Sequence, residues 1–93
     1  MLAMTNKANP NSNVIVTELD GEAVLLHLDT KMYYSLNATG LFIWRLLSPE
    51  HTLADISEKL RAAHAISADK ARDSVSNLIH SLQSEKLVDV SVD

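Results

Sequence analysis

Hydrophobic and polar residues change their spacing once along the chain, near Asn37. Before this point, three runs rich in β-branched, aliphatic and aromatic residues are separated by short polar turns, and they cover residues 14–19, 22–28 and 31–36. Asp20-Gly21 is a strong two-residue hairpin signal, and Asp29-Thr30 favours a second turn. After Asn37 the apolar residues recur three and four positions apart, which indicates helices. The pattern therefore predicts three strands followed by three helices.

The first two helices are expected to begin at capping residues. Asn37 is a suitable N-cap for a helix that runs through about Leu47, before Pro49 interrupts the helical pattern. Thr52-Leu53-Ala54-Asp55 has the form of a capping box, because a threonine is followed three residues later by a carboxylate. The second helix should therefore start within this segment.

The third helix is the longest that the pattern predicts. Ser67 is its expected N-cap, and its apolar residues form one stripe at helical spacing: Ala71, Val75, Leu78, Ile79 and Leu82. Residues 87–90 predict a short final strand. Two helices joined by a tight break beside a small sheet are typical of winged-helix-like folds. The fold class expected is therefore α+β and winged-helix-like, with a three-stranded antiparallel sheet followed by three helices.

The first thirteen residues differ from the rest in composition. They are mostly small and polar and end in Asn9-Pro10-Asn11-Ser12-Asn13. A segment of this kind has little apolar surface to bury, so residues 1–13 are expected to be a flexible tail. Residues 14–93 are then expected to form a single domain that begins near Val14.

Both faces of the predicted sheet are rich in hydrophobic residues. With two-residue turns, alternation places one set of side chains on the first face: Val14, Val16, Ala23, Leu25, Met32, Tyr34 and Leu36. The opposite face then carries a second set: Ile15, Leu19, Val24, Leu26, Leu28 and Tyr33. A sheet of this kind is either covered on two sides or keeps an apolar surface for a partner or for a second copy in a homodimer.

Composition and charge exclude several classes of function. The 93 residues include no cysteine, which removes disulfides and thiolate chemistry, and 46% are hydrophobic, which is enough for a packed core. No apolar run has the length of a membrane helix, and the N-terminus lacks the apolar stretch of a secretory signal. We therefore expect a soluble cytoplasmic protein without a membrane partner.

No set of residues predicts catalysis, a metal site or a cofactor. The four histidines are not spaced three or four residues apart, so they do not form a local metal-binding motif. Gly21 and Gly40 are the only glycines, which leaves no phosphate-binding loop. The chain is therefore not expected to be an enzyme.

DNA binding is the alternative that the expected fold class suggests. The third helix would be the recognition helix, but Asp69, Lys70, Arg72 and Asp73 near its start sum to zero charge. The whole chain carries a formal charge of −4, whereas DNA-binding proteins usually present an excess of Lys and Arg. A nucleic-acid partner is therefore not expected, although a DNA-binding or regulatory domain remains the second hypothesis and a structural interaction module the third.

The third predicted strand favours peptide binding by strand addition. In a sheet ordered as the chain runs, its outer edge has no partner. Exposed edges are usually protected by charge or proline, but Lys31-Met32-Tyr33-Tyr34-Ser35-Leu36 contains no proline and one charge. Such an edge can pair with an incoming extended peptide through backbone hydrogen bonds.

The chain resembles the PqqD-like family from about Val14 to Val90. The resemblance rests on Val24-Leu25-Leu26 after Gly21, on the stretch from Tyr33 through Tyr34-Ser35-Leu36-Asn37-Ala38-Thr39-Gly40, and on Trp44 four residues later. The founding members, which serve quinone synthesis, have a Cys-Asp-Gly after the first helix, where this chain has Leu47-Ser48-Pro49-Glu50. It is therefore more similar to stand-alone members of lasso-peptide clusters.

The resemblance implies a recognition element for ribosomally made precursor peptides. Such a domain binds the leader of the precursor as an extra antiparallel strand on its third strand, beside its third helix, and passes it to a separate peptidase or modifying enzyme. The strand positions implied here are Lys31 to Leu36. On the helix, spacing suggests Arg72 as a partner for a leader carboxylate, Val75 and Ile79 as a pocket for an apolar side chain, and Ser76 beside them.

Overall fold

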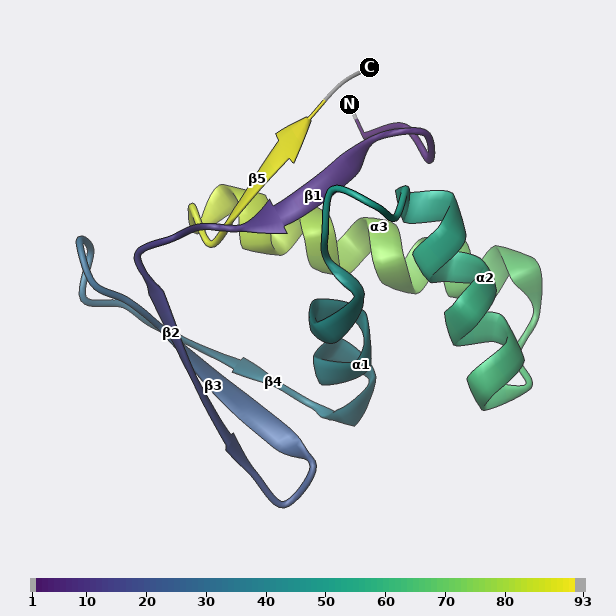
Figure 1. Ribbon diagram of the computed structural model, residues 1–93. Helices are drawn as coiled ribbons and strands as arrows, with labels where there is room; N and C mark the ends of the chain where they lie inside the picture. The colour runs from purple at the N-terminus through teal and green to yellow at the C-terminus, as the bar shows by residue number, and fades with distance from the viewer. Residues whose placement is uncertain (1, 92–93) are drawn as a thin grey trace.

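Five strands and three helices make up residues 2–91, which are the residues that the computed structural model describes (Figure 1). Their order is β1 (Lys7–Pro10), β2 (Val14–Leu19), β3 (Glu22–His27), β4 (Tyr33–Leu36), α1 (Ala38–Leu46), α2 (Leu53–His64), α3 (Ala68–Ser84) and β5 (Val88–Ser91). β2, β3 and β4 form one antiparallel sheet in that order, and β1 pairs with β5. The structure confirms the predicted α+β class and the three-stranded sheet followed by three helices.

The register of the β2–β3–β4 sheet is the one that the hydrophobic alternation predicts. Asp20 and Gly21 both have positive φ, 54° and 79°, as a tight hairpin turn requires. Leu25 lies opposite Val16 on one side and Tyr34 on the other. The face that carries Leu25 is buried under α1, and we call the opposite face the outer face.

The second turn is longer than the expected Asp29-Thr30 pair. β3 ends at His27, the Lys31 N–H donates to the His27 carbonyl at 2.8 Å, and Lys31 has a φ of 62°. The buried His27 ring closes this loop, because its Nδ1 accepts from the Asp29 N–H at 3.1 Å. As a result β4 begins at Tyr33 rather than at Lys31. Met32, expected on the same face as Leu25, lies before the strand and is 58% exposed.

α1 begins where β4 ends, and this junction holds the two elements together. The Asn37 side chain caps the helix by accepting from the Gly40 N–H at 2.8 Å, as predicted. A Cβ added to Gly40 would lie only 3.2 Å from Cδ2 of Leu36, so the absence of a side chain allows the helix to approach the strand closely. Ile43 and Trp44 are buried beneath the sheet.

α2 and α3 pack against each other around a short connection. Thr52 and Asp55 form the predicted capping box at the start of α2, and the Ser67 side chain accepts from the Lys70 N–H at the start of α3. Ala65 ends α2 in the left-handed conformation, with a φ of 52°. Among the described residues, no helix is both long enough and apolar enough to pass through a lipid bilayer.

The N-terminal segment differs from the expected flexible tail. β1 pairs with β5 along its whole length, and Ala8 is fully buried in the core. The Asn6 and Met4 carbonyls accept from the Leu53 and Ala54 N–H groups at 2.8 and 2.9 Å. These are amides of the first turn of α2, which has no partners for them within the helix. The segment is held in place because β1 pairs with β5 and because its carbonyls accept hydrogen bonds from the first turn of α2. Both partners lie far away in sequence. Residues 1, 92 and 93, also part of the predicted tail and domain, lie outside the described residues.

Candidate functional site

The outer edge of β4 is open along the part of the chain that the structure describes. β4 is the last strand of its sheet, and the His27 N–H donates to the Met32 carbonyl at 3.0 Å. In an antiparallel pair, residues that exchange hydrogen bonds recur at every second position. The backbone groups of Tyr34 and Leu36 therefore face β3, while the N–H and C=O groups of Tyr33 and Ser35 face outward. This edge presents two donors and two acceptors to an incoming strand.

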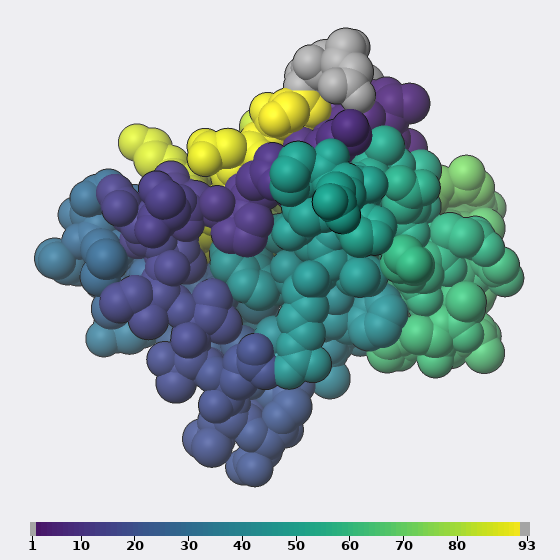
Figure 2. Space-filling view, in the orientation of Figure 1, coloured from purple at the N-terminus to yellow at the C-terminus, as the bar shows by residue number. Residues whose placement is uncertain are grey.

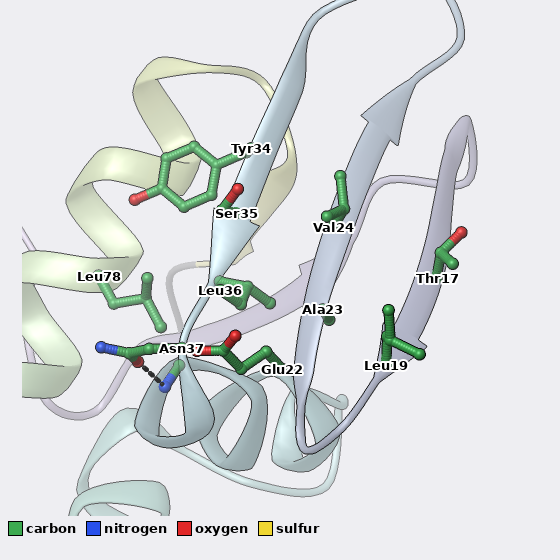
Figure 3. A pocket seen from close by; sticks show the side chains of 11 residues that line it. Thr17, Leu19, Glu22, Ala23, Val24, Tyr34, Ser35, Leu36, Asn37 and Leu78 are labelled. Carbon is green, nitrogen blue, oxygen red and sulfur yellow. Dashed lines mark hydrogen bonds between the residues drawn. The ribbon is translucent and has the colours of Figure 1, made fainter.

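A groove runs between this edge and α3. It has a volume of about 320 Å³, and we call it the α3 groove. The Tyr34 side chain extends from β4 toward α3, and the Leu78 side chain projects from α3 toward the end of β4 (Figure 3). Its lining residues are Tyr34, Asn37, Thr39, Gly40, Ile43, Ser74, Asn77, Leu78 and Ser81. The wall that the helix contributes is uncharged.

A second and larger hollow lies on the other side of the same edge. It has a volume of about 540 Å³ and reaches onto the outer face of the sheet, so we call it the outer hollow (Figure 3). Its lining residues are Thr17, Leu19, Glu22, Ala23, Val24, Tyr34, Ser35, Leu36, Asn37, Gly40 and Leu78. Four of these also line the α3 groove, so the two hollows adjoin each other at the end of β4.

The residues predicted on the third strand fall into four environments. Tyr34 lines both hollows, whereas Tyr33, which is 70% exposed, and Ser35 lie on the outer face. Leu36 is buried in the core. Lys31 and Met32 belong to the preceding loop rather than to the strand.

The residues predicted on the third helix do not line the groove. Val75 and Ile79 are fully buried in the core, so neither is available to a ligand. Arg72 pairs with Asp69 at 2.9 Å. Ser76 is about 200° of helix rotation away from Ser74, which places it and Arg72 on the flank that faces away from β4.

The helix contributes the opposite flank, which helical spacing alone did not identify. Ser74, Asn77, Leu78 and Ser81 follow one another at intervals of three, one and three residues and form one stripe along α3. Leu78 was expected on the inner stripe, and it is indeed half-buried at the border of that stripe. The signal that the sequence offered was this small polar row beside the apolar one. It does not say which flank of the helix adjoins the sheet edge.

The site offers the chemical groups that can recognise a peptide. It offers outward backbone amides and carbonyls, hydroxyl and amide side chains from α3, and apolar surface from Tyr34 and Leu78. Among residues 2–91, Glu22 is the one charged residue that lines either hollow. Within residues 2–91 no group of three or more His, Cys, Asp and Glu side chains is placed to hold a metal ion. The arrangement favours binding of an extended, largely uncharged chain.

These features define a winged-helix-like α+β domain whose sheet has one open edge beside its last helix. The model of the family described as coenzyme PQQ synthesis protein D (PqqD) matches residues 22–88. The chain therefore belongs to the PqqD family, and the resemblance noted in the sequence is confirmed.

Solved structures with similar folds include two complexes. TbiB1 in complex with the TbiA(β) leader peptide has a TM-score of 0.82 and 26% identity, over 91% of this chain and 99% of that one. Lasso peptide synthetase B1 complexed with the leader peptide has a TM-score of 0.79 and 23% identity, over 88% of this chain and 96% of that one. The second comparison supports the fold only. No curated protein matches this chain.

Proposed function

We propose that this protein is a non-catalytic adaptor that binds the leader of a ribosomally made precursor peptide as an additional strand on β4. The open edge of β4 beside the α3 groove is the observation that carries the proposal. TbiB1, which has a similar fold and 26% identity, is a protein solved with a leader peptide bound. The adaptor presents the bound precursor to a separate peptidase or modifying enzyme in the cytoplasm, where ribosomal peptides are made.

Binding of this kind divides affinity and specificity between two parts of the site. The outward groups of Tyr33 and Ser35 supply backbone hydrogen bonds that any extended peptide can form. The α3 groove selects among peptides, because alternate side chains of the added strand point into it. A leader that is disordered before binding loses conformational entropy, so the contacts must exceed that loss. In return, the precursor is held at high effective concentration beside the enzyme.

Proline substitution on β4 tests strand addition directly. Proline removes a backbone N–H, and the edge of a sheet tolerates it where that N–H faces away from the sheet. We expect Tyr33→Pro to fold and to weaken leader binding at least tenfold, or about 1.4 kcal/mol. The measurement is fluorescence anisotropy with a labelled leader from a small precursor gene beside this one, for which we expect binding by the unsubstituted protein in the micromolar range or tighter.

Tyr33→Ala is the matched control, because it removes the same ring and keeps the amide. Ser35→Pro with Ser35→Ala forms a second pair at the other outward amide of β4. If the proline variants are folded by circular dichroism and bind the leader as well as the alanine variants, strand addition is wrong. If the unsubstituted protein binds no leader encoded nearby, the adaptor function itself is wrong.

A further inference from the structure

The outer face of the sheet carries the exposed hydrophobic surface of the molecule. Four of the large hydrophobic residues that are exposed within residues 2–91 lie on this face, namely Ile15, Leu19, Val24 and Tyr33, and the other two, Leu28 and Met32, lie in the loop between β3 and β4. The β2–β3 hairpin projects from the body, as the lower left of Figure 2 shows. Large exposed apolar patches on soluble proteins mark sites of interaction with a partner.

The outer face is hollowed along one row of short side chains. Thr17, Val24 and Ser35 lie directly opposite one another across β2, β3 and β4. The neighbouring row contains Ile15, Leu26 and the large Tyr33, and Leu19 stands on the other side of the short row. All three residues of the short row line the outer hollow, together with Leu19, whereas no residue of the Ile15 row does. The hollow's volume of about 540 Å³ falls within the range of ligand pockets.

The short row ends at the open edge of β4. Ser35 is its last residue, and the next position outward is the place that an added strand would occupy. Side chains of a strand alternate between the two faces of a sheet. A residue of an added strand that lies beside Ser35 therefore directs its side chain over Ser35 and Val24, while its two neighbours point toward Leu78 and the α3 groove.

We propose that the outer hollow is a second recognition pocket for the leader and receives one bulky aliphatic or aromatic side chain. This inference rests on the proposed strand addition. The leader is then recognised on both faces: one residue enters the α3 groove, and a residue adjacent to it in sequence covers Val24. The substrate class is a leader with two consecutive specificity positions, rather than one in which only every second residue matters.

The residues shared by the two hollows favour the leader as the occupant of the outer hollow. Tyr34, Asn37, Gly40 and Leu78 line the outer hollow and the α3 groove alike, so a chain seated at one borders the other. A second copy of the sheet stacked on this face would instead meet the projecting Leu19 and Tyr33, which are 73% and 70% exposed, before it reached the floor at Val24. The shape of the surface therefore fits a single inserted side chain better than a flat sheet.

A double substitution in protein and peptide tests this pocket. Val24→Lys places a charged chain in the hollow, and we expect it to weaken binding of the labelled leader about tenfold or more. Alanine replacement at each leader position in turn should identify two adjacent sensitive residues. Against the leader with alanine at the outward-facing position, Val24→Lys should bind within twofold of the unsubstituted protein, because the side chain it excludes is already absent.

Ile15→Lys is the matched control, since Ile15 is 49% exposed on the same face but does not line the hollow. It should bind the leader within twofold of the unsubstituted protein. Thr17→Lys repeats the test from β2 in case Val24→Lys does not fold. Circular dichroism checks the fold of each variant.

The outcomes separate this inference from the function on which it rests. If the unsubstituted protein binds the leader and Tyr33→Pro weakens binding at least tenfold, but Val24→Lys and Thr17→Lys bind normally, strand addition stands and the outer pocket is wrong. The outer pocket is also wrong if Ile15→Lys weakens binding as much as Val24→Lys. A concentration-dependent dimer that Val24→Lys and Ile15→Lys both disrupt would assign the face to a second copy and overturn the proposal. If no leader binds the unsubstituted protein, both proposals fail.

Discussion

The capping box at the start of α2 links the ionisation of the Asp55 carboxyl group to folding. The Thr52 N–H donates to the Asp55 carboxylate at 3.0 Å, and the Asp55 N–H donates to the Thr52 hydroxyl at 3.1 Å. The backbone hydrogen bond from Thr52 is the main reason that the pKa of Asp55 is lowered, and the Thr52 side chain adds to it. His51 and Lys59 lower this pKa further through their positive charge. The folded protein therefore prefers the ionised carboxylate.

A lowered pKa predicts a defined pH dependence of stability. The contribution of Asp55 is fully present above its ordinary pKa of 3.8 and is lost as the pH falls through the lower value of the folded state. We expect the difference in unfolding free energy between the unsubstituted protein and Asp55→Asn to be constant near neutral pH and to shrink below about pH 4. Urea unfolding at several pH values measures it. A difference that stays the same at pH 3 would contradict the role of the ionised carboxylate.

Capping residues could be predicted from the sequence because their interactions are local. Asn37, Thr52 and Ser67 each bond to an amide three residues later, so both partners lie within one turn of helix. The turn at Asp20-Gly21 was predictable for the same reason, since the conformation depends on two adjacent residues. The turn after β3 was not, because it closes on the buried His27 ring rather than on its own Asp29-Thr30 pair.

At the scale of elements, α3 shows where periodicity stops being informative. Its spacing predicts which side of the helix is buried, and Ala71, Val75, Ile79 and Leu82 are indeed fully buried. Two flanks adjoin this stripe, and spacing does not distinguish the one beside β4 from the one facing away. That choice depends on how α3 crosses the sheet, which is a tertiary property. The predicted Arg72 and Ser76 therefore lie on the flank opposite to Ser74 and Asn77.

The two flanks of α3 make opposite predictions for leader binding. Leu78 is half-buried and lines both hollows, so Leu78→Ala should remove apolar contact and weaken binding about fivefold to tenfold, or about 1 kcal/mol. Arg72→Ala and Ser76→Ala should change affinity less than twofold. Fluorescence anisotropy with the labelled leader measures all three variants.

A control separates contact from stability in that comparison. Ser81→Trp fills the α3 groove without removing a core side chain, because Ser81 lies at the surface of the helix. It should weaken leader binding while the urea midpoint stays close to that of the unsubstituted protein. Loss of binding in Arg72→Ala with normal binding in Ser81→Trp would place the leader on the other flank.

For the molecule as a whole, the N-terminal segment is the largest difference between expectation and structure. Residues 7–10 pair with residues 88–91, at the far end of the sequence. Asn9-Pro10 and the residues around it have the composition of a loop, and no local pattern reports a partner so distant. Strand pairing of this kind depends on the complete fold, which is why composition predicted a tail.

Ala8 provides the test of this arrangement. It is fully buried, so Ala8→Asp would bury a charge without a partner and should lower the free energy of unfolding by about 3 kcal/mol or prevent folding. Ser12→Asp introduces the same charge at an exposed position and should change stability by less than about 0.5 kcal/mol. Urea unfolding followed by circular dichroism compares them. Equal stability of the two variants would show that the segment is a tail in solution.

The charge of the whole molecule separates leader binding from DNA binding, the other function that a winged-helix-like fold suggests. The chain carries a formal charge of −4, Arg72 near the start of α3 is paired with Asp69, and the groove wall on α3 is uncharged.

A DNA complex depends on phosphate contacts, and its affinity falls by a factor of about 1,000 or more between about 50 and 200 mM salt. Backbone hydrogen bonds and apolar contacts release no condensed counterions. We therefore expect leader affinity, measured by anisotropy, to change less than threefold over the same range. A steep decrease would indicate that charged groups outside both hollows supply most of the binding free energy, and that the edge of β4 is not the principal site.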